Sequence, residues 1–276
     1  MVGFLPDSHR VVSFSDDFNL VRNSFVANAG AGFYPTGRET FLTQAYRFSD
    51  GGLGFPDCSG VPSYPIQSFL AELTEDGGCV RLVDVNGPNQ RLGNFFFPAT
   101  RAPVYYAQGS LNSPNPSLAM SRRNDGLTEA WSSLTTTENG PSGDPFRTIK
   151  VLELRAWSSN KLLGAFQQGI QPNNSTRYTN QNGIEVVCPP ATNNGNAVLA
   201  VHDATTGDLL WMHCLAGGTS SPAGFAASAI EPLGDGVLVA LYVTSSVPGL
   251  VPLVIGSRTM MVNAGSSLLM YLTPPR

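Results

Sequence analysis

The chain has 276 residues, of which 42% are hydrophobic and only 13% charged, and its formal net charge is −4 at pH 7. This balance argues against nucleic-acid binding, because phosphate contacts need clustered cations. No apolar run is long enough to cross a membrane as a helix. The 29 glycines and 21 prolines supply many turns and argue against a helical bundle, so we predict a single all-β domain over residues 1–276.

Along the chain one pattern recurs, in which an apolar-alternating strand is followed by a polar turn and a second strand. Its copies lie at residues 10–20, 68–80, 117–131 and 197–211, with a truncated copy at 267–275. A second strand type lies between these hairpins. It is rich in β-branched or aromatic residues, is bounded by Gly, Pro or Asn, and occurs at residues 40–46, 103–111, 161–169 and 236–244.

Repeats of about 50 to 80 residues that hold several strands each are typical of β-propellers, because one small twisted sheet cannot bury both of its faces alone. We predict a small propeller of four to five blades with long loop insertions. The approximate repeats are 10–66, 67–115, 116–195 and 196–265, with a closing strand at 266–274. The similar strands near the two ends either join one blade or leave an edge that pairs with another chain.

The four cysteines follow the same repeat. Cys58 and Cys188 precede the second and fourth hairpins by a similar distance, and Cys79 and Cys214 follow the two turns. We therefore predict the disulfides Cys58–Cys79 and Cys188–Cys214, which imply an extracellular or cell-surface location. The competing interpretation is four buried free thiols in a cytosolic protein.

The fourth repeat carries the clearest motif. Its residues are Asp203, Thr206-Gly207-Asp208, Trp211, Ala216-Gly217-Gly218, Asp235-Gly236 and Asn263-Ala264-Gly265. Residues 197–274 thereby resemble bacterial propeller repeats of the SBBP type, which are related to quinoprotein-like blades. The resemblance implies a propeller fold. It weakens outside this repeat, since the first copy lacks both the glycine and the tryptophan.

No constellation with catalytic spacing occurs. The sequence contains no Gly-x-Ser-x-Gly elbow, His-Glu-x-x-His helix or phosphate-binding loop. His202 and His213 lie on the two strands of one predicted hairpin and are expected to be a cross-strand or surface pair. We therefore predict no catalytic residue, no metal site and no cofactor.

The predicted binding surface contains Trp157, Arg155, Asn173 and Asn174. Trp157 has no equivalent in the other repeats. If exposed, it would stack on a sugar or fill a partner's pocket, and a place in the core is the competing interpretation. The polar stretches 135–146 and 171–182 read as long loops, and loops of this length are often functional.

These observations favour a non-catalytic extracellular propeller that acts as a structural or binding protein and self-assembles through strand edges or loops. Its expected partner is a protein or a second copy, with a glycan as a further candidate. The alternative is a viral coat or protruding-domain protein located in the virion, which would fit a native Met1 without a signal peptide and predicts free cysteines. The third hypothesis is a quinoprotein-like or glycan-acting enzyme.

Overall fold

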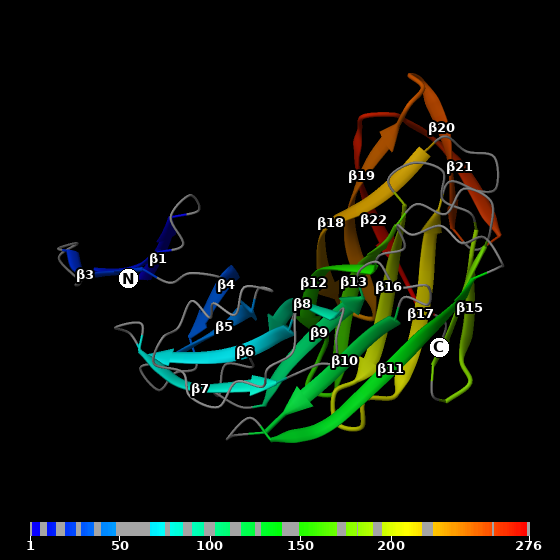
Figure 1. Ribbon diagram of the computed structural model, residues 1–276. Coiled ribbons are helices and arrows are strands. Elements are labelled where there is room, and N and C mark those ends of the chain that lie inside the picture. Colours follow the sequence, from blue (N-terminus) through cyan, green and yellow to red (C-terminus); the bar gives the residue numbers. More distant parts are fainter. Residues whose placement is uncertain are drawn as a thin grey trace. The chain divides into compact units, whose positions relative to one another are not determined.

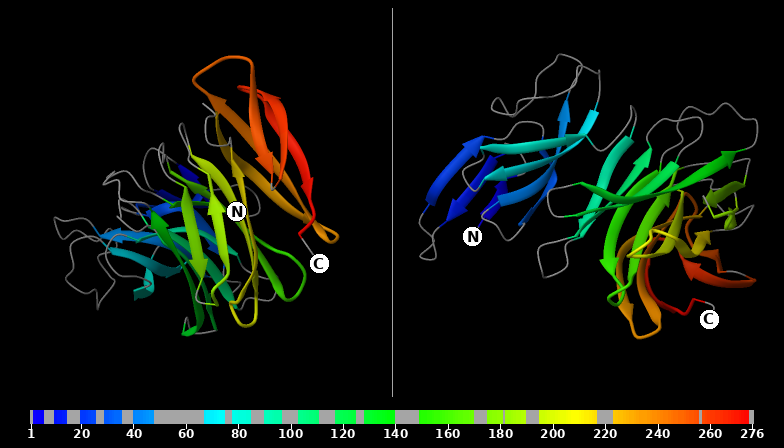
Figure 2. Two further views of the ribbon diagram at one scale, coloured as in Figure 1. Left: turned by 90° about the vertical axis from the view of Figure 1, so that its right-hand side faces the viewer. Right: turned by 90° about the horizontal axis from the view of Figure 1, so that it is seen from below.

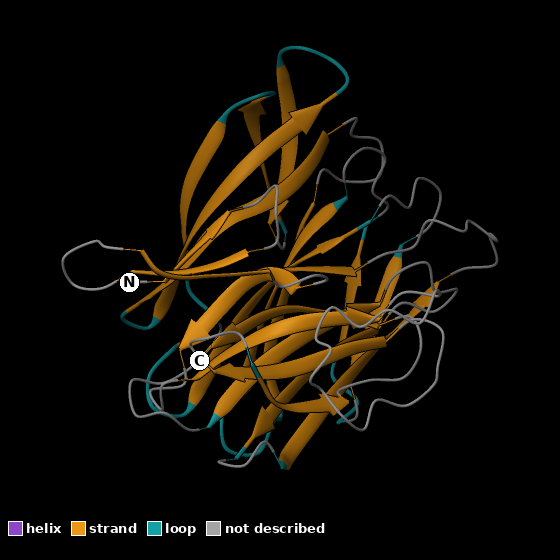
Figure 3. Ribbon diagram, turned by 60° about the vertical axis from the view of Figure 1, so that its left-hand side comes forward, coloured by secondary structure: helices purple, strands orange, loops and turns teal. Residues whose placement is uncertain are grey.

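The computed structural model describes residues 2–5, 10–14, 20–25, 29–35, 40–47, 67–74, 78–84, 90–96, 103–110, 117–124, 128–139, 149–169, 175–180, 182–189, 195–216, 223–255 and 257–274. These residues form strands joined by turns and loops (Figure 3). Within them no helix is long and apolar enough to span a membrane. The all-β prediction is confirmed, and each strand predicted from the repeat is present.

The chain forms two compact units, the first from residues 1–92 and 99–102 and the second from residues 93–98 and 103–276. The first unit contains two antiparallel sheets. One is β1 (Val2–Leu5), β2 (Arg10–Phe14) and β3 (Leu20–Phe25), and the other is β4 (Ala29–Pro35), β5 (Thr40–Arg47), β6 (Gln67–Thr74) and β7 (Cys79–Asp84). The single propeller-like domain over residues 1–276 stays a prediction.

The second unit contains three sheets, which we name I, II and III. Sheet I has the order β15-β14-β11-β10-β9-β8, sheet II the order β12-β13-β16-β17-β20-β21, and sheet III the order β18-β19-β22. The bounds in sheet I are β8 Gln90–Phe96, β9 Val104–Ser110, β10 Ser117–Arg123, β11 Glu129–Asn139, β14 Thr176–Asn180 and β15 Glu185–Cys188. Those in sheet II are β12 Ile149–Ala156, β13 Lys161–Gln168, β16 Asn196–Asp203, β17 Leu209–Ala216, β20 Leu250–Ile255 and β21 Arg258–Asn263. Those in sheet III are β18 Ala223–Leu233, β19 Gly236–Ser245 and β22 Ser267–Leu272 (Figure 1).

Sheet II is the middle layer of this unit, with a hydrophobic core on each face. Leu118, Met120 and Tyr178 of sheet I pack against Phe166 and Val198 of sheet II in the first core. The second core joins sheet II to sheet III and contains residues such as Leu199, Phe225 and Val239. In the left view of Figure 2 the yellow strands of sheet II lie beside the orange and red strands of sheet III.

The middle position of sheet II explains the sequences of its central strands. In β13 and β16 nearly every residue is buried, because alternate side chains enter opposite cores. Such strands read as continuous apolar runs, as in Ala197-Val-Leu-Ala-Val201, and not as alternating patterns. The apolar run of the fourth repeat thus reflects burial on two faces.

Two predicted loops are partly strand, so those predictions were wrong in part. Strand β11 continues through residues 135–139, and β14 occupies residues 176–180 of the second stretch. Both segments are polar, yet Thr135, Thr176 and Asn180 are buried. Their backbones pair with each other, from Thr135 opposite Asn180 to Asn139 opposite Thr176. Ladder hydrogen bonds therefore form these strands without an apolar pattern.

Candidate functional site

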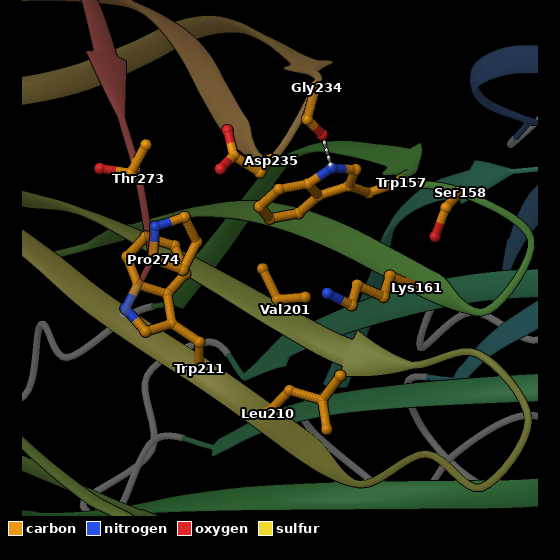
Figure 4. Close-up of a pocket in the computed structure, with 10 residues that line it drawn as sticks. All are labelled: Trp157, Ser158, Lys161, Val201, Leu210, Trp211, Gly234, Asp235, Thr273 and Pro274. Atoms are coloured by element: carbon orange, nitrogen blue, oxygen red, sulfur yellow. Dashed lines mark hydrogen bonds between the residues drawn. The ribbon is translucent and has the colours of Figure 1, made fainter. Parts of the chain in front are cut away.

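A pocket of about 580 Å³ lies between sheets II and III of the second unit. Its walls come from the β12–β13 turn, from β16 and β17, from the β18–β19 turn and from residues 273–274 after β22. Figure 4 shows Trp157 and Trp211 on opposite sides, with Val201 between them and the amine of Lys161 pointing toward Val201. Two indoles, an ammonium and a carboxylate thus meet from distant parts of the sequence.

Trp157 is held rigidly at the upper wall. Its backbone N–H donates to the carbonyl of Lys161 at 2.7 Å, which closes the turn between β12 and β13. Its indole Nε1–H donates to the carbonyl of Gly234 at 3.0 Å (Figure 4). The side chain is only 7% exposed. Trp157 therefore belongs to the second core and also lines the pocket. The place in the core and the place at a candidate binding site, which were competing interpretations of the sequence, both apply.

The turn that carries Trp157 has an unusual backbone. Ser158 adopts a φ of 67°, a left-handed conformation that costs an L-residue about 1–2 kcal/mol. Its hydroxyl donates to Oδ1 of Asn160 at 2.9 Å. Lys161 follows this turn and places its Nζ 5.4 Å from the centroid of the Trp157 ring. The ammonium is thus positioned beside the aromatic face by a cation–π contact.

Trp211 forms the opposite wall from strand β17. Its ring stacks on His213, two residues along the same strand, with centroids 5.6 Å apart and an interplanar angle of 5°. Burial lowers the pKa of His213, so the imidazole is neutral near pH 7. Next to Trp211 the side chain of Leu210 is 47% exposed at the pocket. This wall is therefore apolar and uncharged.

The carboxylate of the pocket belongs to Asp235 in the β18–β19 turn. Gly234 has a φ of 60° at the first central position of this two-residue turn, as a type II′ hairpin requires. The hydroxyl of Tyr271 donates to the Leu233 carbonyl at 3.0 Å and lies 3.2 Å from Oδ1 of Asp235. Desolvation and then the hydrogen bond to Asp235 raise the pKa of Tyr271. Strand β22 thereby orients the turn that carries Asp235.

Chemically, this arrangement suits non-covalent binding. Its volume lies within the range of about 300–1,000 Å³ that is usual for ligand sites, which combine apolar walls with a few polar groups. Lys161 supplies donors and Asp235 supplies acceptors. In the part of the chain that the structure describes, no group of three or more His, Cys, Asp or Glu side chains is arranged to hold a metal.

Of the predicted binding residues that the structure describes, Trp157 lines the pocket and Arg155 does not. Arg155 forms an ion pair with Glu153, and its Nε lies 3.9 Å from a carboxylate oxygen of Glu231. Glu153 in turn accepts a hydrogen bond from the backbone N–H of Ile230 at 2.8 Å. Arg155 thus ties sheet II to sheet III. Asn173 and Asn174 lie outside the described residues, so their role stays a prediction.

The sequence reasoning missed Lys161, Trp211 and Asp235 as members of one site. Trp211, a motif residue of the fourth repeat, packs against the second core. Asp235-Gly236 belongs to the motif of the fourth repeat, and the structure places Asp235 in the β18–β19 turn. Nothing in the linear pattern indicated that this turn would face Trp157, because their contact spans 77 residues.

The predicted disulfide Cys188–Cys214 is present, with its Cα atoms 5.6 Å apart. It joins β15 of sheet I to β17 of sheet II through the first core. Cys79 is also disulfide-bonded. Its pairing with Cys58 stays a prediction, because Cys58 lies outside the described residues.

The two histidines do not face each other. His202 is opposite Leu209 in the β16–β17 ladder, whereas His213 is opposite Leu199. His202 is fully buried, and neither of its ring nitrogens has a hydrogen-bond partner in the described part of the chain. Burial lowers the pKa of His202 to about 4. It is a neutral core residue.

Comparison with protein-family models and with curated protein sequences finds no match to this chain.

Proposed function

We propose that the chain is a non-catalytic, extracellular binding protein built from propeller-type blades, and that the pocket between Trp157 and Trp211 is its ligand site. The observation that carries this proposal is the convergence of Trp157, Trp211, Lys161 and Asp235 on one pocket. The proposed activity is non-covalent recognition by these four side chains.

The topology supports the blade architecture. Four strands are neighbours in one antiparallel sheet in three places, namely β4–β7, β8–β11 and the set β12, β13, β16 and β17, and in the first two places the four strands also follow one another in the chain. A propeller blade is such a four-stranded sheet, packed face to face on its neighbours. Sheets I and II, and sheets II and III, pack face to face through the two cores.

The disulfide supports the extracellular location, since such bonds persist mainly in oxidising compartments. The disulfide also weighs against the hypothesis of a viral coat protein, which predicts free cysteines, because no free cysteine occurs among the described residues. The proposed location therefore rests on Cys188–Cys214.

The ligand class that fits these walls is a neutral saccharide. A sugar ring has an apolar face that stacks on an indole and hydroxyls at its edge that exchange hydrogen bonds. Here Trp211 offers the stacking surface, while Lys161 and Asp235 offer a donor and acceptors beside it. The two opposite charges suit hydroxyls better than a strongly charged ligand, which one of them would repel.

The test is titration of the full chain with a panel of neutral oligosaccharides. Binding is measured by isothermal titration calorimetry and by tryptophan fluorescence. We expect Trp211→Ala to weaken binding at least tenfold, or about 1.4 kcal/mol, because it removes the stacking surface. The matched control is Tyr242→Ala, which removes an exposed aromatic outside the pocket and should leave binding unchanged. Absence of binding across the panel, or cleavage of a bound sugar, would overturn the proposal.

A further inference from the structure

Strand β22 is an edge of sheet III and differs from its counterparts in the other repeats. The corresponding strands β6, β10 and β16 each lie between two neighbours, whereas β22 pairs with β19 alone in the sheet order of the described residues. In the other repeats the next strand of the hairpin lies on the far side, so β7 is beside β6, β11 beside β10 and β17 beside β16. Among the described residues, no strand thus occupies the position beside β22 on its far side from β19 in sheet III.

Burial shows the effect of this vacancy. In β16 the residues Ala197, Leu199 and Val201, which enter the second core, are at most 2% exposed. In β22 the inward residues Leu268, Met270 and Leu272 enter the same core but are only half-buried. On the outer face Leu269 is 70% and Tyr271 49% exposed. Both faces of β22 would gain burial from another strand.

Charge distinguishes β22 from the other edge strands of sheets I to III. Folded proteins usually protect edge strands with charged residues, prolines or bulges. The other edge strands of sheets I to III each contain a charged residue, namely Arg91 in β8, Glu185 in β15, Lys150 in β12, Arg258 in β21 and Glu231 in β18. β18 also has a bulge at Ala227–Ala229. The sequence of β22, Ser267-Leu-Leu-Met-Tyr-Leu272, has no such protection.

We propose that β22 pairs antiparallel with β22 of a second copy of the chain, which joins two sheets III into one continuous six-stranded sheet. Antiparallel pairing of a strand with itself obeys a two-fold axis, so one edge serves both subunits. The occupant has to be apolar at alternate positions on both faces and free of charge. The strand β22 itself meets this requirement, whereas the other edge strands of sheets I to III each bring a charge.

The alternation of β22 selects the register. Residues opposite each other in an antiparallel pair point to the same face, so an inward residue must oppose an inward residue. A two-fold axis at Met270 places Leu268 opposite the partner subunit's Leu272, and Leu269 opposite the partner subunit's Tyr271. Every pair over residues 268–272 is then apolar or aromatic. An axis at Leu269 would instead place Ser267 opposite the partner subunit's Tyr271.

The test compares the oligomeric state of the full chain and two lysine variants by sedimentation velocity over a wide concentration range. We expect the chain to dimerise and Leu269→Lys to raise the dissociation constant at least tenfold. Leu269 is mostly exposed, so the folded subunit tolerates the change. The matched control is Met261→Lys on the edge strand β21, where Met261 is 55% exposed, and it should leave the dimer intact.

Cysteine cross-linking tests the register independently. With the axis at Met270, Met270→Cys should form a disulfide-linked dimer on oxidation, and Leu269→Cys should form far less. A chain that is monomeric at every concentration would overturn the proposal, whether β22 is left open or is covered by another strand of the same chain. A dimer that Leu269→Lys leaves unchanged, or that only Met261→Lys dissociates, would overturn it as well.

Discussion

Removal of the Cys188–Cys214 disulfide tests how sheets I and II are held together. The bond links residues that are 26 positions apart, and for a closed loop of that length the chain-entropy relation gives about 12 cal/mol/K, or about 3.5 kcal/mol at 25 °C. Both cysteines are also buried, at 0% and 9% exposure, so their replacement by alanine loses packing of the sulfur atoms. We expect Cys188→Ala/Cys214→Ala to lower the free energy of unfolding by about 3–5 kcal/mol.

The assay is equilibrium urea unfolding of the oxidised chain and of the double variant, monitored by tryptophan fluorescence. Cys79 stays bonded in the variant, so the comparison isolates one bridge. A loss below about 1 kcal/mol, the size of an average point substitution, would refute this expectation. It is also refuted if a reductant destabilises the double variant as much as it destabilises the natural chain.

Two further predictions concern buried groups of the same unit. The pKa of His202 is lowered to about 4 in the folded chain and is about 6.5 when unfolded, so the unfolded state binds more protons between these values. Stability is therefore full above pH 6.5 and falls by about 3 kcal/mol as the pH drops to 4. Urea unfolding at several pH values should show this loss in the natural chain but not in His202→Leu, and equal pH dependence in both would contradict it. Gly207 has a φ of 82°, and an added Cβ would lie 2.5 Å from Cε3 of Trp131, so we expect Gly207→Ala to cost about 2–4 kcal/mol. The control Gly183→Ala has a similar φ of 77° but nothing within 4 Å of the added Cβ and should cost about 1 kcal/mol; equal losses of unfolding temperature in the two variants would show that the Trp131 contact is unimportant.

The sequence alone was sufficient for the local elements of this protein. Alternating apolar residues bounded by glycine and polar turns predicted the hairpin at 197–211, and β16 and β17 occupy it with a turn at Gly207. Strand formation depends on neighbouring residues, so a local pattern records it. The Cys188–Cys214 bond was predictable for a related reason, since its position follows the repeat.

Strands outside the predicted repeat pattern became visible only in the tertiary structure. β14, which is polar, and β15 form a short hairpin on the edge of sheet I, and β20 and β21 form a hairpin that extends sheet II. The strand β20 contains Pro252, a residue that argues against a central strand. These strands exist because their backbones complete hydrogen-bonded ladders supplied by distant segments.

The pocket, too, was decided by the tertiary structure. Trp157 was identified from the sequence as a large aromatic outside the repeat, but its partners Gly234 and Asp235 follow some 77 residues later. Their meeting depends on how sheet III packs on sheet II through the second core. Side-chain alternation determines which face of a strand is apolar, whereas the choice of the sheet that covers that face depends on packing across the whole unit.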